Sequence, residues 1–170
     1  MLLRTILHHP LTDCTLFAAP DANGQMLLHG VCFGLHTSLG NTQSVASDDS
    51  QLRSYRYRLQ SFLDGDVHSL DDILLCLDGC TPFQQRVMVT ARSIPWGSTV
   101  SYTELARRAG YPQAVRAAAS VMRTNRFPLV VPCHRVVRKD GAIGGFMGQT
   151  TGECVVLKRR LLERELFLLK

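Results

Sequence analysis

Residues 129–137 set the strongest limit on how this chain folds, because an aliphatic run there encloses a proline, a cysteine and two polar side chains. The run predicts a buried strand that ends or bulges after Pro132, since proline cannot donate a hydrogen bond to a neighbouring strand. The backbone then holds the thiol of Cys133 at the floor of a cavity, which suits a nucleophile. The alternative is an inert core cysteine. Burying the polar side chains of His134 and Arg135 within an apolar run costs free energy. Their presence there therefore favours a functional thiol.

The composition indicates a globular intracellular protein. Of the 170 residues, 45% are apolar, and no apolar run is long enough to cross a membrane. The N-terminal residues lack the hydrophobic region and the cleavage site of a signal peptide, so none is expected. Six scattered cysteines without a framework spacing predict reduced thiols. We expect a cytoplasmic protein, or a nuclear one if the source is eukaryotic.

The charge is divided unevenly along the chain. Residues 1–80 contain four arginines and nine aspartates, whereas residues 81–170 contain 15 basic and five acidic side chains. Sixteen of the nineteen basic residues are arginines, which suit bidentate phosphate contacts. This division predicts two domains, of which the C-terminal one faces a polyanion. An ordinary solvated basic surface is the alternative.

Residues 1–79 predict an N-terminal α/β domain. Short apolar runs separated by turn residues are typical of an antiparallel meander, with strands at 2–7, 15–19, 26–31 and 32–35. Residues 38–50 are polar and predict a surface loop. Apolar residues then recur at helical spacing between Asp49, a capping residue, and Gly65. A further strand is expected at 73–77.

Residues 80–170 predict a mainly helical C-terminal domain. Thr81 followed by Pro82 is typical of a helix start, and this helix extends to about Ala91. Near the end of the chain, a turn at 138–141 and a flexible loop at 144–148 precede a basic helix from about residue 153 to 168.

Two short helices in this domain have helix-turn-helix spacing. The first begins at Ser101, which forms a capping box with Glu104, and ends at Ala109. The second begins at Gln113 or Ala114 and ends at about Arg123. Beside Arg116 it carries a face of small side chains, Ala117, Ala118, Ala119 and Ser120. Such a face lets a backbone approach a groove closely, and tight packing between helices explains it equally well.

Neighbouring residues on a strand point to opposite faces, so Cys133 and His134 cannot pair directly there. Either the backbone twists after Pro132, or a water molecule connects the two groups. Metal binding is a further use of this pair, but no second pair of ligands stands at a suitable spacing. A second metal-binding set could meet across the N-terminal sheet, from His8, His9, Cys14 and Cys32. We expect no metal and no cofactor.

The ordered set of motifs in residues 81–165 resembles the O6-alkylguanine-DNA alkyltransferase family. Its signature is Pro132-Cys133-His134-Arg135, with aliphatic residues on both sides. The resemblance includes Thr81-Pro82-Phe83-Gln84, Ile94-Pro95-Trp96-Gly97, Tyr102-Thr103-Glu104-Leu105-Ala106, Arg116, Asn125, Lys158, Leu161-Leu162 and Glu165. Residues 1–80 match in layout only, which implies a ribonuclease H-like antiparallel sheet with a helix.

The resemblance implies a DNA repair protein that flips a damaged guanine out of double-stranded DNA and transfers the O6-alkyl group to its own cysteine. The family's helix-turn-helix enters the minor groove, where Arg116 fills the place of the flipped base. Simple phosphate contact is the alternative for this arginine. The expected DNA-binding set is Arg116, Tyr102, Ala117, Ala118, Ala119, Ser120 and Arg123. The expected pocket wall is Met122, Pro128, Val136, Phe146, Met147 and Lys158. The protein is expected to act as a monomer.

The implied chemistry assigns Cys133 as a thiolate nucleophile with a pKa lowered by the local positive field. His134 acts as a base through water and is oriented by Glu165. Tyr102 hydrogen-bonds the base as negative charge develops, and Asn125 braces the segment before the nucleophile. The thioether product cannot be hydrolysed, so each molecule reacts once.

The chain departs from the family pattern around the pocket. Phe146 stands where the family usually has tyrosine, which removes a hydroxyl. Residues 149–152 have no counterpart in the family, and the loop to which they belong shapes the alkyl side of the pocket. Met88 replaces a frequent aromatic residue, and Ala119-Ser120 replaces residues that are often glycine.

Three other functions compete with the alkyltransferase. A lesion-binding relative without catalysis would lack Cys133. A regulatory DNA-binding protein would need base-reading side chains where the second helix has alanines. A thiol hydrolase would turn over more than once.

Overall fold

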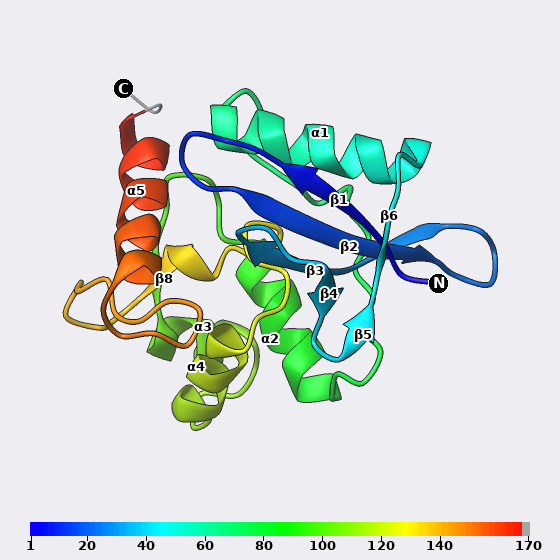
Figure 1. The fold of residues 1–170 in the computed structure, drawn as a ribbon. Helices are drawn as coiled ribbons and strands as arrows, with labels where there is room; N and C mark the ends of the chain where they lie inside the picture. Colours follow the sequence, from blue (N-terminus) through cyan, green and yellow to red (C-terminus); the bar gives the residue numbers. More distant parts are fainter. Residues whose placement is uncertain (168–170) are drawn as a thin grey trace. The chain divides into compact units, whose positions relative to one another are not determined.

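The computed structural model describes residues 1–167 (Figure 1). The described chain folds into two compact units. The N-terminal unit comprises Met1–Leu77 together with Arg126–Val130, and the rest of the described chain forms the C-terminal unit. The short segment Arg126–Val130 therefore packs with residues distant from it in sequence.

A four-stranded sheet forms the centre of the N-terminal unit. Its strands are β1 (Leu3–Leu7), β2 (Cys14–Pro20), β3 (Met26–Phe33) and β6 (Val45–Ala46), in the order β3-β2-β1-β6. The first three are antiparallel, as the meander predicts, and β6 runs parallel to β1. The core of the unit includes the fully buried Leu16, Phe17 and Leu28.

Two details of this sheet differ from the sequence prediction. No separate strand occupies 32–35, because residues 32 and 33 continue β3 and Leu35 is exposed. The predicted loop at 38–50 contains β4 (Ser38–Leu39), β5 (Thr42–Gln43) and β6. These strands are two residues long, so their polar side chains give no alternating pattern.

Helix α1 (Ser50–Asp64) confirms the predicted helix and both of its ends. The Asp49 carboxylate accepts hydrogen bonds from the backbone N–H groups of Gln51 and Leu52, and Gly65 closes the helix with φ of 83°. The helix lies along β1 (Figure 1) and buries an apolar face. That face is Leu52, Leu59, Phe62 and Leu63.

The predicted strand at 73–77 is wrong, because only Leu75 forms a bridge, parallel to Leu28. The Leu28 N–H donates to the Leu74 carbonyl at 2.8 Å, and the Cys76 N–H donates to the Leu28 carbonyl at 2.8 Å. Further along the same edge of β3, Val31 donates to the carbonyl of Arg126 at 2.8 Å. Two segments thus share this edge of β3, and each makes only a few backbone hydrogen bonds with it.

The C-terminal unit contains four α-helices within the described residues: α2 (Pro82–Arg92), α3 (Tyr102–Arg108), α4 (Val115–Arg123) and α5 (Glu153–Phe167). Thr81 and Gln84 form a complete capping box at the start of α2. Strand β7 (Val100–Ser101) pairs in parallel with β8 (Val136–Val137) and leads directly into α3. Residue 168, where the predicted closing helix ends, lies outside the described residues.

Helices α3 and α4 form the predicted helix-turn-helix, joined by a turn at Gly110 with φ of 89°. Ser101 caps α3 by accepting from the Glu104 N–H at 3.1 Å. The Glu104 carboxylate instead accepts from Arg107 and Arg108, at 2.7–2.8 Å. The predicted capping box at Ser101 is therefore only half formed, because two arginines one turn away are stronger donors than a backbone N–H. Among the described residues, no helix is long and apolar enough to span a membrane.

Candidate active site

The backbone before Cys133 is a turn and not the predicted strand. Leu129 has a φ of +73°, and the Cys133 N–H donates to the Val131 carbonyl at 2.7 Å. Cys133–Arg135 then forms a single turn of 3₁₀ helix that leads into β8. The prolines at 128 and 132 cannot donate ladder hydrogen bonds, so an extended pairing is not available here. The expected backbone twist after Pro132 is this helical turn.

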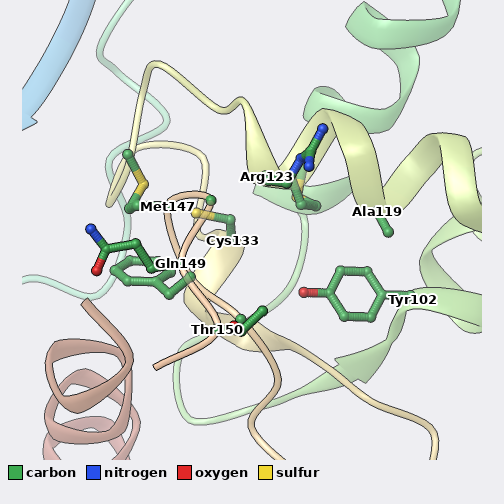
Figure 2. Close-up of a pocket in the computed structure, with 11 residues that line it drawn as sticks. Tyr102, Ala119, Arg123, Cys133, Met147, Gln149 and Thr150 are labelled. Atoms are coloured by element: carbon green, nitrogen blue, oxygen red, sulfur yellow. The ribbon is translucent and has the colours of Figure 1, made fainter. Parts of the chain in front are cut away.

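Cys133 lies at the wall of a cavity of about 230 Å³ and is itself only 3% exposed (Figure 2). Tyr102 from α3 points its hydroxyl toward the cavity, and Ala119 and Arg123 come from α4 (Figure 2). The complete lining is Tyr102, Ala119, Met122, Arg123, Cys133, Gly145, Phe146, Met147, Gly148, Gln149 and Thr150. All of these residues belong to the C-terminal unit.

A tight turn in the loop shapes one side of this cavity. Phe146 and Gln149 exchange two backbone hydrogen bonds, of 2.8 and 2.9 Å. Between them, Met147 and Gly148 both have positive φ, 48° and 81°. At Gly145 an added Cβ would lie 2.8 Å from the Gln149 carbonyl oxygen, so only glycine allows this close approach. The predicted flexible loop is a defined turn in the structure.

The side chain of Asn125 forms a hydrogen bond with the sulfur of Cys133. Its buried side-chain amide donates to the Cys133 Sγ at 3.1 Å and to the Val131 carbonyl at 2.9 Å. The sequence resemblance implies a bracing role for Asn125, and this geometry fits it. The amide also places a hydrogen-bond donor directly on the nucleophile.

The pKa of the Cys133 thiol is raised, contrary to the sequence expectation, because burial disfavours the thiolate more than its neighbours favour it. The Asn125 hydrogen bond, the charge of Lys158 and the backbone N–H groups at 133 and 134 act in the opposite direction. The resting sulfur is therefore a protonated thiol, with groups in place that stabilise the thiolate once the proton leaves.

His134 and Glu165 form a buried pair, with Nε2 and Oε1 2.7 Å apart. Burial by itself raises the pKa of Glu165, but hydrogen bonds and charges from His134 and Arg135 outweigh it and lower the pKa to about 2. Because the carboxylate is ionised, Nε2 must carry the proton that it donates. Nδ1 of His134 is buried and has no hydrogen-bond partner among residues 1–167.

Arg135 was not assigned a role from the sequence, yet it donates more hydrogen bonds to Glu165 than His134 does. Its Nε and Nη2 donate to the carboxylate at 2.9–3.1 Å, and its Nη1 donates to the Ile94 carbonyl at 2.7 Å. The Gly97 N–H adds a further donor to Glu165 at 3.0 Å. The only sequence signal for this arrangement was the cost of burying Arg135.

Lys158 is fully buried and donates to the Val136 carbonyl at 2.6 Å and to the Gly145 carbonyl at 3.2 Å. Burial lowers the pKa of its ammonium to about 8, although the charge of Cys133 acts in the opposite direction. Lys158 thus lies behind the cavity and connects β8 to the loop, and it is not among the residues that line the cavity.

The other predicted pocket residues divide into two groups. Met122, Phe146 and Met147 line the cavity beside Cys133. Val136 is buried in β8, and Pro128 is buried in the segment Arg126–Val130 of the N-terminal unit; neither lines the cavity. The sequence missed the contributions of Gly145, Gly148, Gln149 and Thr150, for which the density of glycine was the only signal.

The small-residue face of α4 has three different environments. Arg116, Ala117, Ser120 and Arg123 are exposed, and Ala119 lines the cavity. Ala118 is fully buried, so its predicted place on the DNA-binding surface is wrong. A helix turns about 100° per residue, so successive alanines cannot all face the same groove. Tight packing therefore explains Ala118, whereas the approach of Ala117 and Ser120 to a groove stays a prediction.

The alternative metal set in the N-terminal sheet does not assemble. His8 pairs with Asp13 and His9 pairs with Asp64, each at 3.1 Å. Within residues 1–167, no group of three or more His, Cys, Asp or Glu side chains could hold a metal ion. All six cysteines are free thiols.

Known proteins resemble this chain over most of its length. The family described as "6-O-methylguanine DNA methyltransferase, DNA binding domain" matches residues 82–167. A methylated-DNA--protein-cysteine methyltransferase from Methanothermobacter thermautotrophicus is 40% identical over 163 residues, which cover 94% of this chain and 82% of the relative. The crystal structure of Mycobacterium tuberculosis O6-methylguanine methyltransferase superposes with a TM-score of 0.79 and 28% identity, covering 98% of this chain and 94% of that chain.

A further crystal structure, of Mycobacterium tuberculosis OGT in complex with DNA, has a TM-score of 0.76 and 28% identity, and covers 98% of this chain and 94% of that one. The residues that match the family include the cysteine motif, the helix-turn-helix and the helix that supplies Glu165. The chain belongs to the O6-methylguanine-DNA methyltransferase family.

Proposed function

We propose that this protein repairs DNA by transferring the O6-alkyl group, a methyl group in the simplest case, from damaged guanine to Cys133. The observation that carries the proposal is a single thiol at the wall of a cavity, followed directly in sequence by a buried histidine that pairs with the Glu165 carboxylate. Family membership and the relatives that act on methylated DNA support the same reaction.

The substrate is double-stranded DNA with the damaged base flipped out, because the O6 atom is hidden inside the base stack. Helix α4 carries the exposed Arg116, which would enter the stack from the minor groove, beside the small exposed side chains of Ala117 and Ser120. The excess of arginine in residues 81–170 suits phosphate binding.

In the chemical step, the Cys133 thiolate attacks the alkyl carbon in line with the carbon–oxygen bond. A carbon–sulfur bond forms, the bond to O6 breaks, and its electron pair remains on the guanine. The hydroxyl of Tyr102, which faces the cavity, donates a hydrogen bond to the leaving base. The pKa of this phenol is raised by burial and by the charge of Cys133, so the hydroxyl stays protonated and can act as a donor.

The thiol proton leaves through His134. Since Nε2 donates to Glu165, Nδ1 has a free lone pair, and a water molecule between Nδ1 and the sulfur would complete the path. The products are a thioether on Cys133 and a guanine anion, which takes up one proton to become unmodified guanine while His134 releases the thiol proton to solvent. Water does not hydrolyse a thioether, so each protein molecule reacts once, and the reaction requires no cofactor.

Free thiols and a DNA substrate are consistent with action in the cytoplasm, or in the nucleus of a eukaryote. We also propose that the protein acts as a monomer, because one chain suffices to supply the thiol, the histidine–carboxylate pair and the Tyr102 hydroxyl that the reaction needs.

The test is incubation with duplex DNA that contains O6-methylguanine, followed by mass spectrometry of proteolytic peptides. We expect one added methyl group on the peptide that contains Cys133 and none in Cys133→Ala. Cys154→Ser, which removes a half-buried thiol at the start of α5, is the matched control and should react normally. An unmodified Cys133 peptide after complete repair of the DNA would exclude this function.

A further inference from the structure

Glu165 has more donors than a carboxylate needs to orient one histidine. Five hydrogen bonds reach its two oxygens: one from His134, one from Gly97 and three from the Nε and Nη2 of Arg135. The carboxylate, the imidazole and the guanidinium belong to residues that are each 4% exposed or less. The His134–Glu165 pair expected from the sequence is therefore part of a triad. In this triad, the Glu165 carboxylate has two partners that can carry positive charge, His134 and Arg135.

We propose that Arg135 is a positioning residue, which neutralises Glu165 so that the carboxylate orients His134 without drawing a second proton onto the ring. The proposal rests on the proposed function, in which His134 accepts the proton of the Cys133 thiol. It assigns a task in the reaction to a side chain that is not among the residues lining the cavity.

The physical reason is the charge balance of the buried site. A carboxylate 2.7 Å from an imidazole favours the imidazolium, which cannot act as a base. An arginine that forks onto the same carboxylate offsets that field and supplies a repulsive positive charge. Lys158 from α5 adds a second positive charge near the ring, and the thiol of Cys133 adjoins it.

The direction of the His134 pKa agrees with this balance. Burial has the largest effect and lowers the pKa. Glu165 raises it through its hydrogen bond and charge, while Arg135 and Lys158 lower it. The net shift is downward, so the ring is neutral at physiological pH and ready to accept a proton.

The guanidinium is also fixed in place. Its Nη1 donates to the Ile94 carbonyl at 2.7 Å, and its central carbon lies 5.7 Å from the centre of the Trp96 ring. Trp96 and Gly97 are adjacent in the turn that follows α2, so this turn holds both the arginine and the carboxylate. A lysine at 135 would keep the charge but could not form the planar fork.

The experiment measures the titration of the His134 ring by ¹⁵N NMR in the free protein, and the pH dependence of methyl transfer in single-turnover assays. The variants are Arg135→Met, Arg135→Lys and the double variant Arg135→Met/Glu165→Gln. Arg53→Met, which removes an exposed arginine of α1, is the matched control. His134 signals are assigned by their loss in His134→Gln.

In Arg135→Met we expect the midpoint of the His134 titration, and the acid limb of the rate profile, to move up by about one pH unit or more. Arg135→Lys should fall between this variant and the wild type, and the double variant should reverse the shift because no anion remains. Arg53→Met should titrate as the wild type does.

A folded Arg135→Met protein in which His134 titrates as in the wild type would overturn the proposal. If Arg135→Met does not fold, the double variant decides, since it lacks both the guanidinium and the carboxylate that the guanidinium neutralises; a His134 midpoint above the wild-type value would then contradict the proposal. The NMR measurement requires no DNA. A wild-type protein that never alkylates Cys133 would refute the proposed function and leave this titration result intact.

Discussion

Cys133 combines a reactive atom with an environment that keeps it unreactive until it is needed. Burial raises the pKa of the thiol, while Asn125 and Lys158 act to lower it. The resting protein therefore presents few thiolates to other electrophiles. We attribute the reactivity to the complex with the flipped base, in which the proton can leave through His134 at the moment of attack.

Tyr102→Phe tests the contribution of the leaving-group donor. Loss of a hydrogen bond to a developing anion costs about 1.5–3 kcal/mol, so we expect single-turnover transfer to slow by roughly 10- to 100-fold. Affinity for DNA that contains an abasic site should change much less than the rate, because no base then occupies the cavity. An unchanged rate would show that another group stabilises the leaving base.

At the scale of secondary-structure elements, the sequence correctly predicted the helices whose start and end are marked by residues at their own termini. Helix α1 has a capping aspartate and a terminal glycine, and α2 has a complete capping box, so both were correct. The strand predicted before Cys133 was wrong, because the conformation of this segment depends on two prolines and on Leu129, whose backbone is left-handed. An apolar run in the sequence does not reveal these constraints. The role of Arg135 was missed because the sequence does not show that its guanidinium turns away from the cavity toward Glu165 on α5.

The face of α4 allows packing and DNA contact to be separated with two neighbouring residues. Ala118→Leu overfills a fully buried position and should lower the free energy of unfolding by about 1–3 kcal/mol. Ala117→Leu, at an exposed position, should leave stability unchanged and weaken DNA binding about tenfold, or about 1.4 kcal/mol. Urea unfolding and fluorescence anisotropy measure the two effects. Equal effects of both variants on DNA affinity at full stability would contradict this division.

At the scale of the whole molecule, the buried triad of His134, Arg135 and Glu165 should lower the free energy of unfolding as the pH falls. The pKa of Glu165 falls from 4.5 to about 2 on folding, so its contribution is present above pH 4.5 and is lost as the pH falls toward 2. The pKa of His134 is also lowered, so the unfolded chain binds its proton first, and stability begins to fall below pH 6.5.

We therefore expect the free energy of unfolding to decrease from pH 6.5 downward, with about 3 kcal/mol attributable to Glu165 below pH 4.5. Urea unfolding of the wild type, Glu165→Gln and the exposed control Glu163→Gln across this range checks the sign. The profile of Glu165→Gln should be flatter than that of either other protein. A profile as steep as that of the wild type would mean that other carboxylates cause the loss.

The most direct test of the account is to count how many methyl groups one protein molecule removes. The protein is incubated with an excess of duplex DNA that carries radiolabelled O6-methylguanine, and the label on protein is compared with the guanine restored in DNA. We expect both quantities to level off together at about one per molecule, with all of the label on the Cys133 peptide. Restored guanine that continues to accumulate beyond the labelled protein would contradict a thioether formed once on Cys133.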